Sequence, residues 1–262
     1  MKKKNCLLWR IESDLPGPSW LFGTMHIKDA KAFGLLDTLY QKIDQCEAFA
    51  TELNLDEMRS GGTAPIQLQP VLPLILLLPV KVYQKLRRIL KKALKLELER
   101  LTFMHPMIIM NIISEAILSN EMPVFLDDQL WQYATSVDKK RFGIETIEEQ
   151  INIMQQLPLE DHLENLKKIA KNYSRFRKSL LKLLDYYEKG NLKLLHKSAL
   201  KGAGNRKEVM VFSRNRIMAD RIDELIRQQN TVFCAIGAGH LGGEQGVLRL
   251  LKQKGYRLKP VA

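Results

Sequence analysis

The chain has 262 residues, of which 45% are hydrophobic and 27% are charged. This composition is typical of a globular protein with a sizeable core in one or two domains, and it excludes a disordered tail or a fibre as the default. The net charge of +12 is regional. Residues 81–100 carry +6 and residues 167–207 carry +11, which leaves −5 for the rest of the chain.

The cysteines and the N-terminal sequence predict a cytoplasmic location for the chain as given. Cys6, Cys46 and Cys234 show no C-x-x-C spacing, which indicates buried free thiols in a reducing compartment rather than disulfides or a thiolate zinc site. Residues 1–4 resemble the start of a signal peptide, but Arg10 follows too soon for an apolar segment. A periplasmic or exported location is expected instead if a signal has been removed.

Residue periodicity predicts an α/β fold. The expected elements are strands at 7–11 and 20–24, a helix at 35–43, a strand at 48–53, helices between 66 and 135, a strand at 141–145, helices at 147–157, 160–188 and 205–228, a strand at 231–236, a helix at 247–251 and a strand at 256–259. We therefore expect one domain over residues 1–262. It includes a helical insertion or cap at roughly 66–135, preceded by a hinge at 61–63, and a basic helical segment at roughly 160–207.

The most apolar run lies at residues 71–80 and is too short and too rich in proline to cross a bilayer. It is interpreted as a buried helix or an apolar wall over a pocket. A surface patch for a lipid or a partner is the alternative.

Both basic regions have the pattern of amphipathic helices. In the first, Val82, Leu86 and Leu90 recur at helical spacing, while lysine and arginine occupy the other face. Such helices bind anionic membranes or nucleic acid in some proteins, and are solvated faces packed on a core in others. An anionic surface is retained as a partner hypothesis, and a nucleic-acid partner is not expected.

A short G-x-x-H pattern occurs twice, each time after a predicted strand. The two copies are Gly23–His26 and Gly237–His240, where Gly23, Gly237 and Gly239 permit a tight turn and a close backbone approach. Ligand groups gather at strand ends in open α/β folds, so His26 and His240 are candidate metal ligands. Glu52 follows a strand of its own and supplies the carboxylate that a His/Glu/His site needs for Zn, Mn, Co or Fe.

Each histidine taken alone also fits a hydrogen-bonded turn residue. The three remaining histidines lie in helical context without carboxylates at ligand spacing and are assigned structural roles: His105, His162 and His196. The chain has no G-x-x-x-x-G-K-[ST] and no G-x-S-x-G motif, so neither nucleotide use nor a serine nucleophile is expected.

Five ordered blocks of this sequence resemble the TraB/GumN/PrgY family, to which the Tiki membrane proteases also belong. These blocks are residues 9–11 with 21–26, residues 50–53, residues 126–134 with 143–150, residues 214–219, and residues 237–256. The resemblance implies a fold like that of the erythromycin-esterase and ChaN group. In that fold a central mixed sheet is built from two related halves and is flanked by helices.

The resemblance also implies a metal-dependent, peptidase-like hydrolase with Mn or Co as the expected ion. His26, Glu52 and His240 match the family's presumed site, with Glu52 as third ligand or as the base that takes a proton from the bound water. Glu145 is a second candidate base, or else a helix N-cap.

Two further residues are expected on a helix beside this site, with Ile217 and Met218 on its apolar face. Arg214 would stabilise an oxyanion or bind a substrate carboxylate, or would form a buried salt bridge with Glu52 or Glu145. Asn215 would orient a ligand. The expected function is therefore hydrolysis of a peptide or a small-molecule substrate, and the alternative is a non-catalytic peptide- or small-ligand-binding protein on the same fold.

Overall fold

The computed structural model describes residues 5–60, 72–118 and 120–261. The predicted hinge at 61–63 lies outside these residues. The elements are β1 Leu8–Glu12, β2 Ser19–Thr24, α1 Leu36–Asp44, β3 Ala48–Thr51, α2 Leu55–Arg59, α3 Leu74–Leu77, α4 Val80–Leu94, α5 Pro106–Ile117, α6 Leu126–Ser136, β4 Lys140–Gly143, α7 Ile147–Gln155, α8 Leu159–Lys171, α9 Tyr173–Glu188, α10 Leu192–Ala203, α11 Ser213–Gln229, β5 Val232–Gly237, α12 Ala238–Leu241, α13 Val247–Gln253 and β6 Arg257–Pro260, with short 3-10 helices at Ala30–Phe33, Leu98–Leu101 and Gly204–Arg206 and a π-helix at Glu208–Phe212.

A six-stranded mixed sheet with the order β4-β3-β5-β2-β1-β6 forms the centre of the molecule. The strands β4, β3, β5 and β2 run parallel to one another, and β1 is antiparallel to both β2 and β6. The central strands β2 and β5 are buried almost throughout, as expected for parallel strands covered on both faces. The predicted α/β class with a mixed sheet is therefore confirmed.

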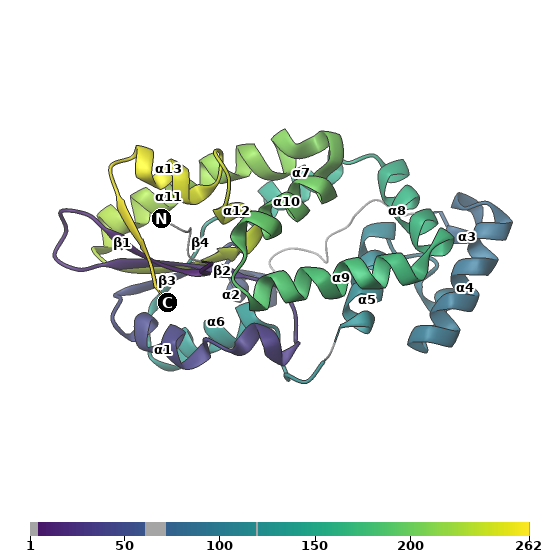
Figure 1. Ribbon diagram of the computed structural model, residues 1–262, viewed down its shortest axis with the longest axis horizontal. Coiled ribbons are helices and arrows are strands. Elements are labelled where there is room, and N and C mark those ends of the chain that lie inside the picture. The colour runs from purple at the N-terminus through teal and green to yellow at the C-terminus, as the bar shows by residue number, and fades with distance from the viewer. Residues whose placement is uncertain (1–4, 61–71, 119, 262) are drawn as a thin grey trace.

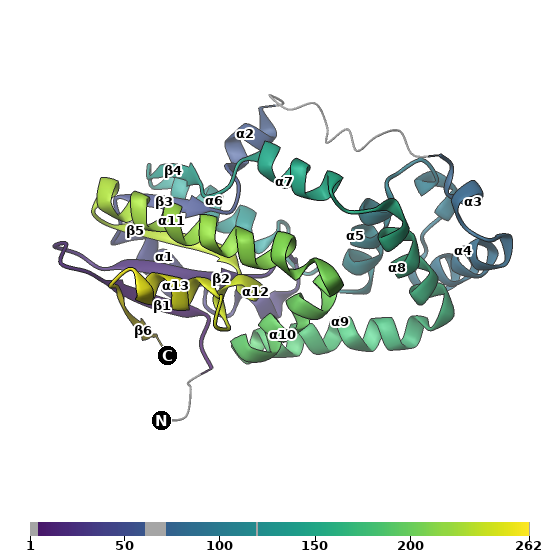
Figure 2. The ribbon, with the colours of Figure 1, turned by 90° about the horizontal axis from the view of Figure 1, so that it is seen from above.

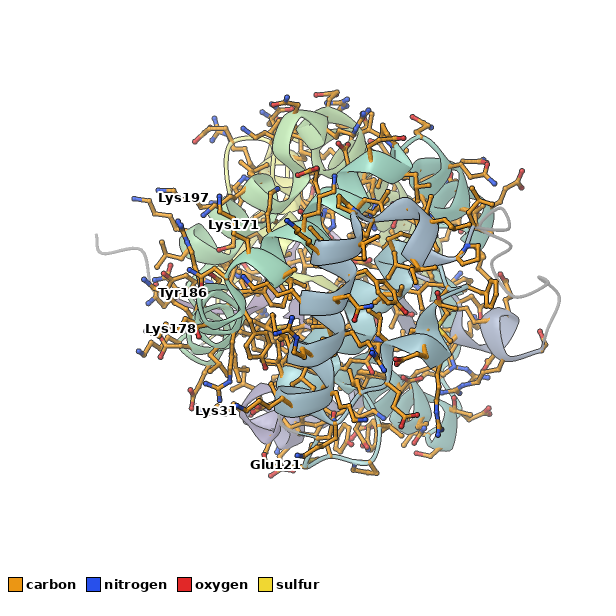
Figure 3. The ribbon with its side chains drawn as sticks, turned by 90° about the vertical axis from the view of Figure 1, so that its right-hand side faces the viewer. Lys31, Glu121, Lys171, Lys178, Tyr186 and Lys197 are labelled. Atoms are coloured by element: carbon orange, nitrogen blue, oxygen red, sulfur yellow. The ribbon has the colours of Figure 1, made fainter. Side chains whose placement is uncertain are left out.

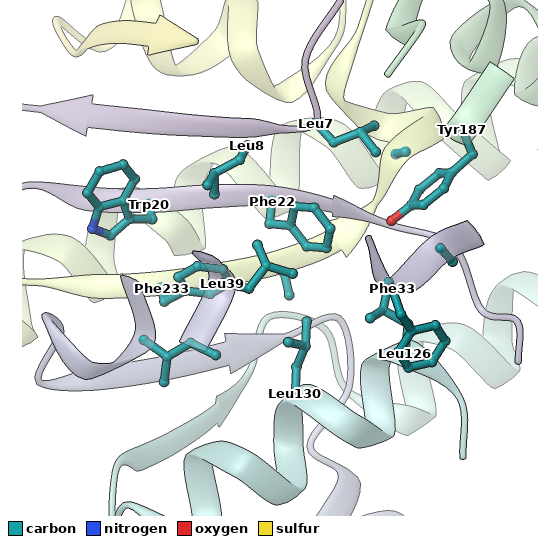
Figure 4. Close-up of a cluster of buried hydrophobic side chains, with 14 of the residues drawn as sticks. Leu7, Leu8, Trp20, Phe22, Phe33, Leu39, Leu126, Leu130, Tyr187 and Phe233 are labelled. Atoms are coloured by element: carbon teal, nitrogen blue, oxygen red, sulfur yellow. The ribbon is translucent and has the colours of Figure 1, made fainter. Parts of the chain in front are cut away.

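Helices cover both faces of the sheet (Figure 1). On one face α1 and α6 pack over a core that includes Phe22, Leu39 and Leu130 (Figure 4). On the other face α11 and α13 bury Met218, Ile222 and Leu251 against β5 and its neighbours. Each predicted strand falls at or within a few residues of an observed one, because local periodicity already encodes which side chains face a core.

A helical region extends from one end of the sheet and has a core of its own (Figure 2). Its helices α3, α4, α5 and α8 enclose buried residues such as Leu86, Leu90, Ile113 and Leu166. The expected insertion at 66–135 also included α6, which instead lies against β3 and buries Trp131 in the core of the sheet. Among the described helices, none combines the length and apolarity that a membrane crossing requires.

The described residues of the apolar run at 71–80 are partly buried, as expected of a helix in a core, and partly exposed, as expected of a surface patch. Leu74 and Leu78 are buried in the helical core, whereas Leu72, Leu76 and Val80 are exposed. A four-residue helix that ends before Pro79 can turn only part of its surface inward, so its other side chains, such as Leu76, face solvent. Ile217 also differs from the prediction. It is expected on the apolar face of its helix, but its side chain in α11 is exposed.

Candidate active site at the edge of the sheet

Three neighbouring parallel strands end at one edge of the sheet, and the G-x-x-H histidines and Glu52 follow them. In the register, Thr24 of β2 lies opposite Gly237 of β5, and Thr51 of β3 lies opposite Ala235 of β5. Residues that come directly after these strands therefore share the C-terminal edge, where ligands bind in open α/β sheets.

Glu52 is held at this edge by one backbone donor and one side-chain donor. Its Oε1 accepts a hydrogen bond of 2.6 Å from the backbone N–H of Gly237, and its Oε2 accepts one of 3.2 Å from Nη2 of Arg214. The Glu52 side chain is 27% exposed. A carboxylate has about four lone-pair positions, so these two bonds leave acceptor capacity free.

Arg214, at the start of α11, makes its strongest contacts with Glu145. Its Nε and Nη2 donate to the two carboxylate oxygens of Glu145 at 2.8 and 2.6 Å, a bidentate pair. Burial alone would lower the pKa of Arg214, but the hydrogen bond to Glu145 and the charges of Glu52 and Glu145 outweigh it and raise that pKa. Arg214 therefore forms ion pairs with both Glu145 and Glu52, where a salt bridge with either one was expected, and its role toward a substrate or an oxyanion stays a prediction.

Glu145 is not the N-cap of the following helix. Thr146 occupies that position and forms a capping box with Glu149, in which each side chain accepts a hydrogen bond from the other residue's backbone N–H. The Glu145 carboxylate is only 2% exposed and accepts a further bond of 3.1 Å from the Gln150 side chain. Its contacts fix the guanidinium of Arg214.

His240 is oriented by Asn215, the residue after Arg214 on α11. Asn215 is buried, and its Nδ2 donates to the carbonyl of Gln245 at 2.6 Å, which leaves its Oδ1 as an acceptor for Nδ1 of His240 at 2.6 Å. We therefore assign the His240 proton to Nδ1, so that Nε2 carries the free lone pair. Burial lowers the pKa of His240, with Arg214 acting in the same direction against the two glutamates, and this favours the neutral ring.

His196 of α10 also belongs to this edge, although its sequence context predicted a structural role. Its Nδ1 lies 2.9 Å from the carbonyl of Gly239 and must donate to it, so its Nε2 has no proton when the ring is neutral. Its ring lies against Gly243, and its charge acts on His240. No local sequence signal marks this residue, because its partners lie more than forty positions away.

His26 lies apart from the Glu52–Arg214–Glu145 set. Its ring stacks on Phe125 at a centroid distance of 3.9 Å, and its Nδ1 lies 3.2 Å from Oδ2 of Asp127 on α6. Burial lowers its pKa, but the hydrogen bond to Asp127 and the nearby acidic charges exceed that effect and raise the pKa overall. The His26 side chain is 64% exposed.

The three turn glycines allow neighbouring side chains to pack closely, and none of the three has a left-handed backbone conformation. A Cβ at Gly237 would lie 2.9 Å from Oε1 of Glu52, and one at Gly23 would lie 2.7 Å from the Leu241 side chain. One at Gly239 would lie 2.9 Å from Cβ of Ala199. The hydroxyl of buried Tyr187 donates to the carbonyl of Gly23 at 2.8 Å and points at the end of β2 (Figure 4), a contact that the sequence did not indicate.

The edge contains imidazole and carboxylate groups, which divalent ions prefer as ligands. The Nδ1 atom of each of its histidines lies at hydrogen-bond distance from an oxygen acceptor, as is usual for metal-binding histidines. The part of the chain that the structure describes nevertheless contains no group of three His, Cys, Asp or Glu residues close enough to hold a metal ion. The structure gathers Glu52, Glu145, Arg214 and His240 and leaves His26 beside Asp127. The predicted His/Glu/His set stays a prediction.

Comparison with known proteins places this edge in a family context. The sequence pattern of the TraB/PrgY/gumN family matches residues 7–260, nearly the whole chain. The chain belongs to the TraB/PrgY/gumN family. No solved structure matches it at a significant level.

Curated relatives of this family member are metalloproteases by name. It is 24% identical to Metalloprotease TIKI2 of Danio rerio over 98% of this chain and 61% of the relative. It is 23% identical to Metalloprotease TIKI1 of Danio rerio over 97% of this chain and 63% of the relative. A shorter match to the Metalloprotease TIKI homolog of Amphimedon queenslandica is 51% identical over 49 residues, or 18% of this chain and 10% of the relative. The chain thus spans less than two thirds of the length of these relatives.

Proposed function

We propose that this family member is a metal-dependent hydrolase of peptide bonds, with its site at the C-terminal edge of β2, β3 and β5. The observation that carries the proposal is the orientation of His240. Asn215 holds its Nδ1 and leaves the Nε2 of the neutral ring with a free lone pair, the arrangement expected of a metal-binding imidazole, and the charge of Glu52 acts on this ring. The distant likeness to proteins named metalloproteases supports the same class of reaction.

In this proposal His240 and His26 bind the ion through Nε2, and Glu52 is the third ligand or the general base. When bound, a divalent ion supplies Lewis acidity and a water of lowered pKa. We favour Mn or Co from the family resemblance, with Zn as the alternative. His26 lies beside Asp127 and Glu52 beside Arg214, so the two residues would have to approach one another to hold the same ion.

Arg214 and Glu145 act on this site by positioning. Glu145 is nearly inaccessible, and both of its oxygens accept hydrogen bonds from Arg214, so it serves poorly as a base. Arg214 in turn donates a hydrogen bond to Oε2 of Glu52. Its Nη1 protons have no partner among the described residues, and this is the part of the guanidinium that could contact a substrate oxygen.

The test begins with metal binding, which does not require a known substrate. Metal-free protein titrated with Mn, Co or Zn should become more stable to heat, by about 2.7 kcal/mol at a hundredfold excess over Kd. His26→Ala and His240→Ala should each abolish the shift. His105→Asn is the matched control. His105 lies outside the site and is the N-cap of α5, and asparagine retains this capping role.

A peptide library analysed by mass spectrometry then tests turnover. Cleavage by the wild type that is lost in His26→Ala and His240→Ala is the expected result. Full cleavage by either variant, or the absence of stabilisation by every metal, would contradict the proposal.

The engagement of both glutamates by Arg214 favours one alternative function, a non-catalytic protein that binds a peptide or a small ligand. Such a protein needs a fixed charged surface and no free base. It would retain library peptides with their masses unchanged after long incubation. Cleavage products would eliminate this alternative.

A further inference from the structure

Six of the large apolar side chains that are exposed in the described residues lie between positions 72 and 104. We call them the apolar tip: Leu72, Ile75, Leu76, Val80, Phe103 and Met104. Leu76 and Phe103 are 70% and 72% exposed. The backbone N–H of Leu74 donates to the carbonyl of Thr102 at 2.8 Å, which brings the two parts of the tip side by side.

A basic helix face continues directly from the apolar tip. Val80 is the first residue of α4, and the exposed positions that follow along the helix are basic apart from Gln84 and Ala93. We call the following residues the basic face: Lys81, Lys85, Arg88, Lys92 and Lys95. Within residues 5–60, 72–118 and 120–261 none of them forms an ion pair with a carboxylate. The nearby Glu97 and Glu99 are paired with Arg100 and Arg87.

The helix that carries this charge is firmly seated. Leu86 and Leu90 on its opposite face are fully buried, and they pack in a core shared with Leu166 and Ile169 of α8. Figure 3 shows the molecule from this end, with α4 toward the viewer and with Lys178 and Lys197 at the side of the view. The apolar tip and the basic face therefore occupy the end of the molecule that projects farthest from the sheet (Figure 2).

We propose that this end of the helical region binds the surface of an anionic lipid bilayer. The basic face contacts lipid phosphates, and the apolar tip enters the boundary between headgroups and acyl chains. A bilayer offers negative charge and an apolar layer side by side, which matches the two adjoining surfaces. A nucleic acid would satisfy the lysines but would leave Leu76 and Phe103 in water. The inference does not depend on the proposed hydrolase function.

The first test is flotation of the whole chain with vesicles. Binding is expected with mixed phosphatidylcholine and phosphatidylglycerol vesicles, with little binding to phosphatidylcholine alone and a decline as salt is added. The variant Lys81→Gln/Arg88→Gln/Lys92→Gln should lose at least about tenfold in vesicle affinity, since each basic side chain near an anionic surface contributes to the free energy of binding. The control Lys178→Gln/Lys182→Gln/Lys197→Gln removes the same charge elsewhere and should lose much less.

The second test separates insertion from simple charge attraction. Leu76→Ser/Phe103→Ser should reduce vesicle affinity about tenfold, because two apolar side chains no longer leave water. The matched control is Met58→Ser/Ile217→Ser, which removes exposed apolar side chains from α2 and α11 and should leave binding at the wild-type level. All four variants change exposed residues, so their thermal midpoints should stay close to that of the wild type.

Several results would overturn the inference. These are equal binding to neutral and anionic vesicles, no binding at all, and an equal loss in the Lys178 control. A second copy of the chain as the occupant would appear as a dimer in sedimentation that Leu76→Ser/Phe103→Ser converts to monomer. A nucleic-acid partner would appear as oligonucleotide binding that the Lys81 variant weakens and the Leu76 variant leaves unchanged.

Discussion

The edge of the sheet and the end of the helical region use charge in opposite ways. At the edge, Arg214 and Glu145 are largely withdrawn from water, and each satisfies the other. On α4, lysines and arginines stand in solvent, most of them without a carboxylate partner among the described residues. A buried pair is costly to break and fixes geometry, whereas an exposed array contributes little to stability and remains available to a partner.

The two regions also differ in how their apolar surface is covered. The sheet has helices on both faces, so β2 and β5 are buried along their length. The helical region has a single core, and α3 and the start of α4 leave apolar side chains outside it. The first region is therefore covered on both faces, whereas the second leaves part of its apolar surface in water, and three measurements test that contrast.

The largest expected effect comes from Arg214→Ala. The change leaves the Glu145 carboxylate, which is 2% exposed, without its positively charged partner. Removing one partner of a buried ion pair costs about 3–5 kcal/mol, so the free energy of unfolding measured with urea should fall by that amount.

Arg249→Ala is the matched control for this measurement. Arg249 lies 3.8 Å from Glu244, whose side chain is 91% exposed, so this pair should contribute less than about 1 kcal/mol. Equal losses in the two variants would remove the distinction between a buried and an exposed charge system.

An intermediate effect is expected from Leu86→Ala in the helical core. This fully buried side chain packs between α4 and α8, and its truncation should cost about 2–5 kcal/mol. Because the helical region has its own core, hydrogen exchange should accelerate in α4, α5 and α8 and stay near the wild-type rate in β2 and β5. Leu39→Ala, in the core under the sheet, should accelerate exchange in those strands instead. Uniform acceleration in both variants would show that the cores unfold as one.

The smallest effect concerns pH. His162 is buried in the helical region, its Nε2 has no hydrogen-bond partner among the residues that the structure describes, and burial lowers its pKa. The unfolded chain therefore binds more protons than the folded chain once the pH falls below about 6.5, so stability is retained above that value and declines below it. Urea unfolding at about pH 7.5 and about pH 5.5 should show a smaller difference in His162→Leu than in the wild type. An unchanged difference would mean that other groups govern the acid response.

Much of the fold could be predicted from local pattern. The strand at 231–236 and the helix at 35–43 were both expected from apolar periodicity, and β5 and α1 lie within one or two residues of them. The helical region was less accessible. Apolar residues near 71–80 predict burial by composition, but Leu76 and Val80 are exposed because α3 is too short to bury its whole surface.

For the candidate site, local pattern identified the residue types and their placement after strands: His26, Glu52 and His240, with Arg214 and Asn215 in a separate block. Which of them meet is visible in the three-dimensional structure alone. Arg214 reaches Glu145 and Glu52 across 69 and 162 positions, and Asp127 reaches His26 across 101. Periodicity reflects neighbours along one element, whereas these pairings depend on how strands and helices pack, and no local pattern records that.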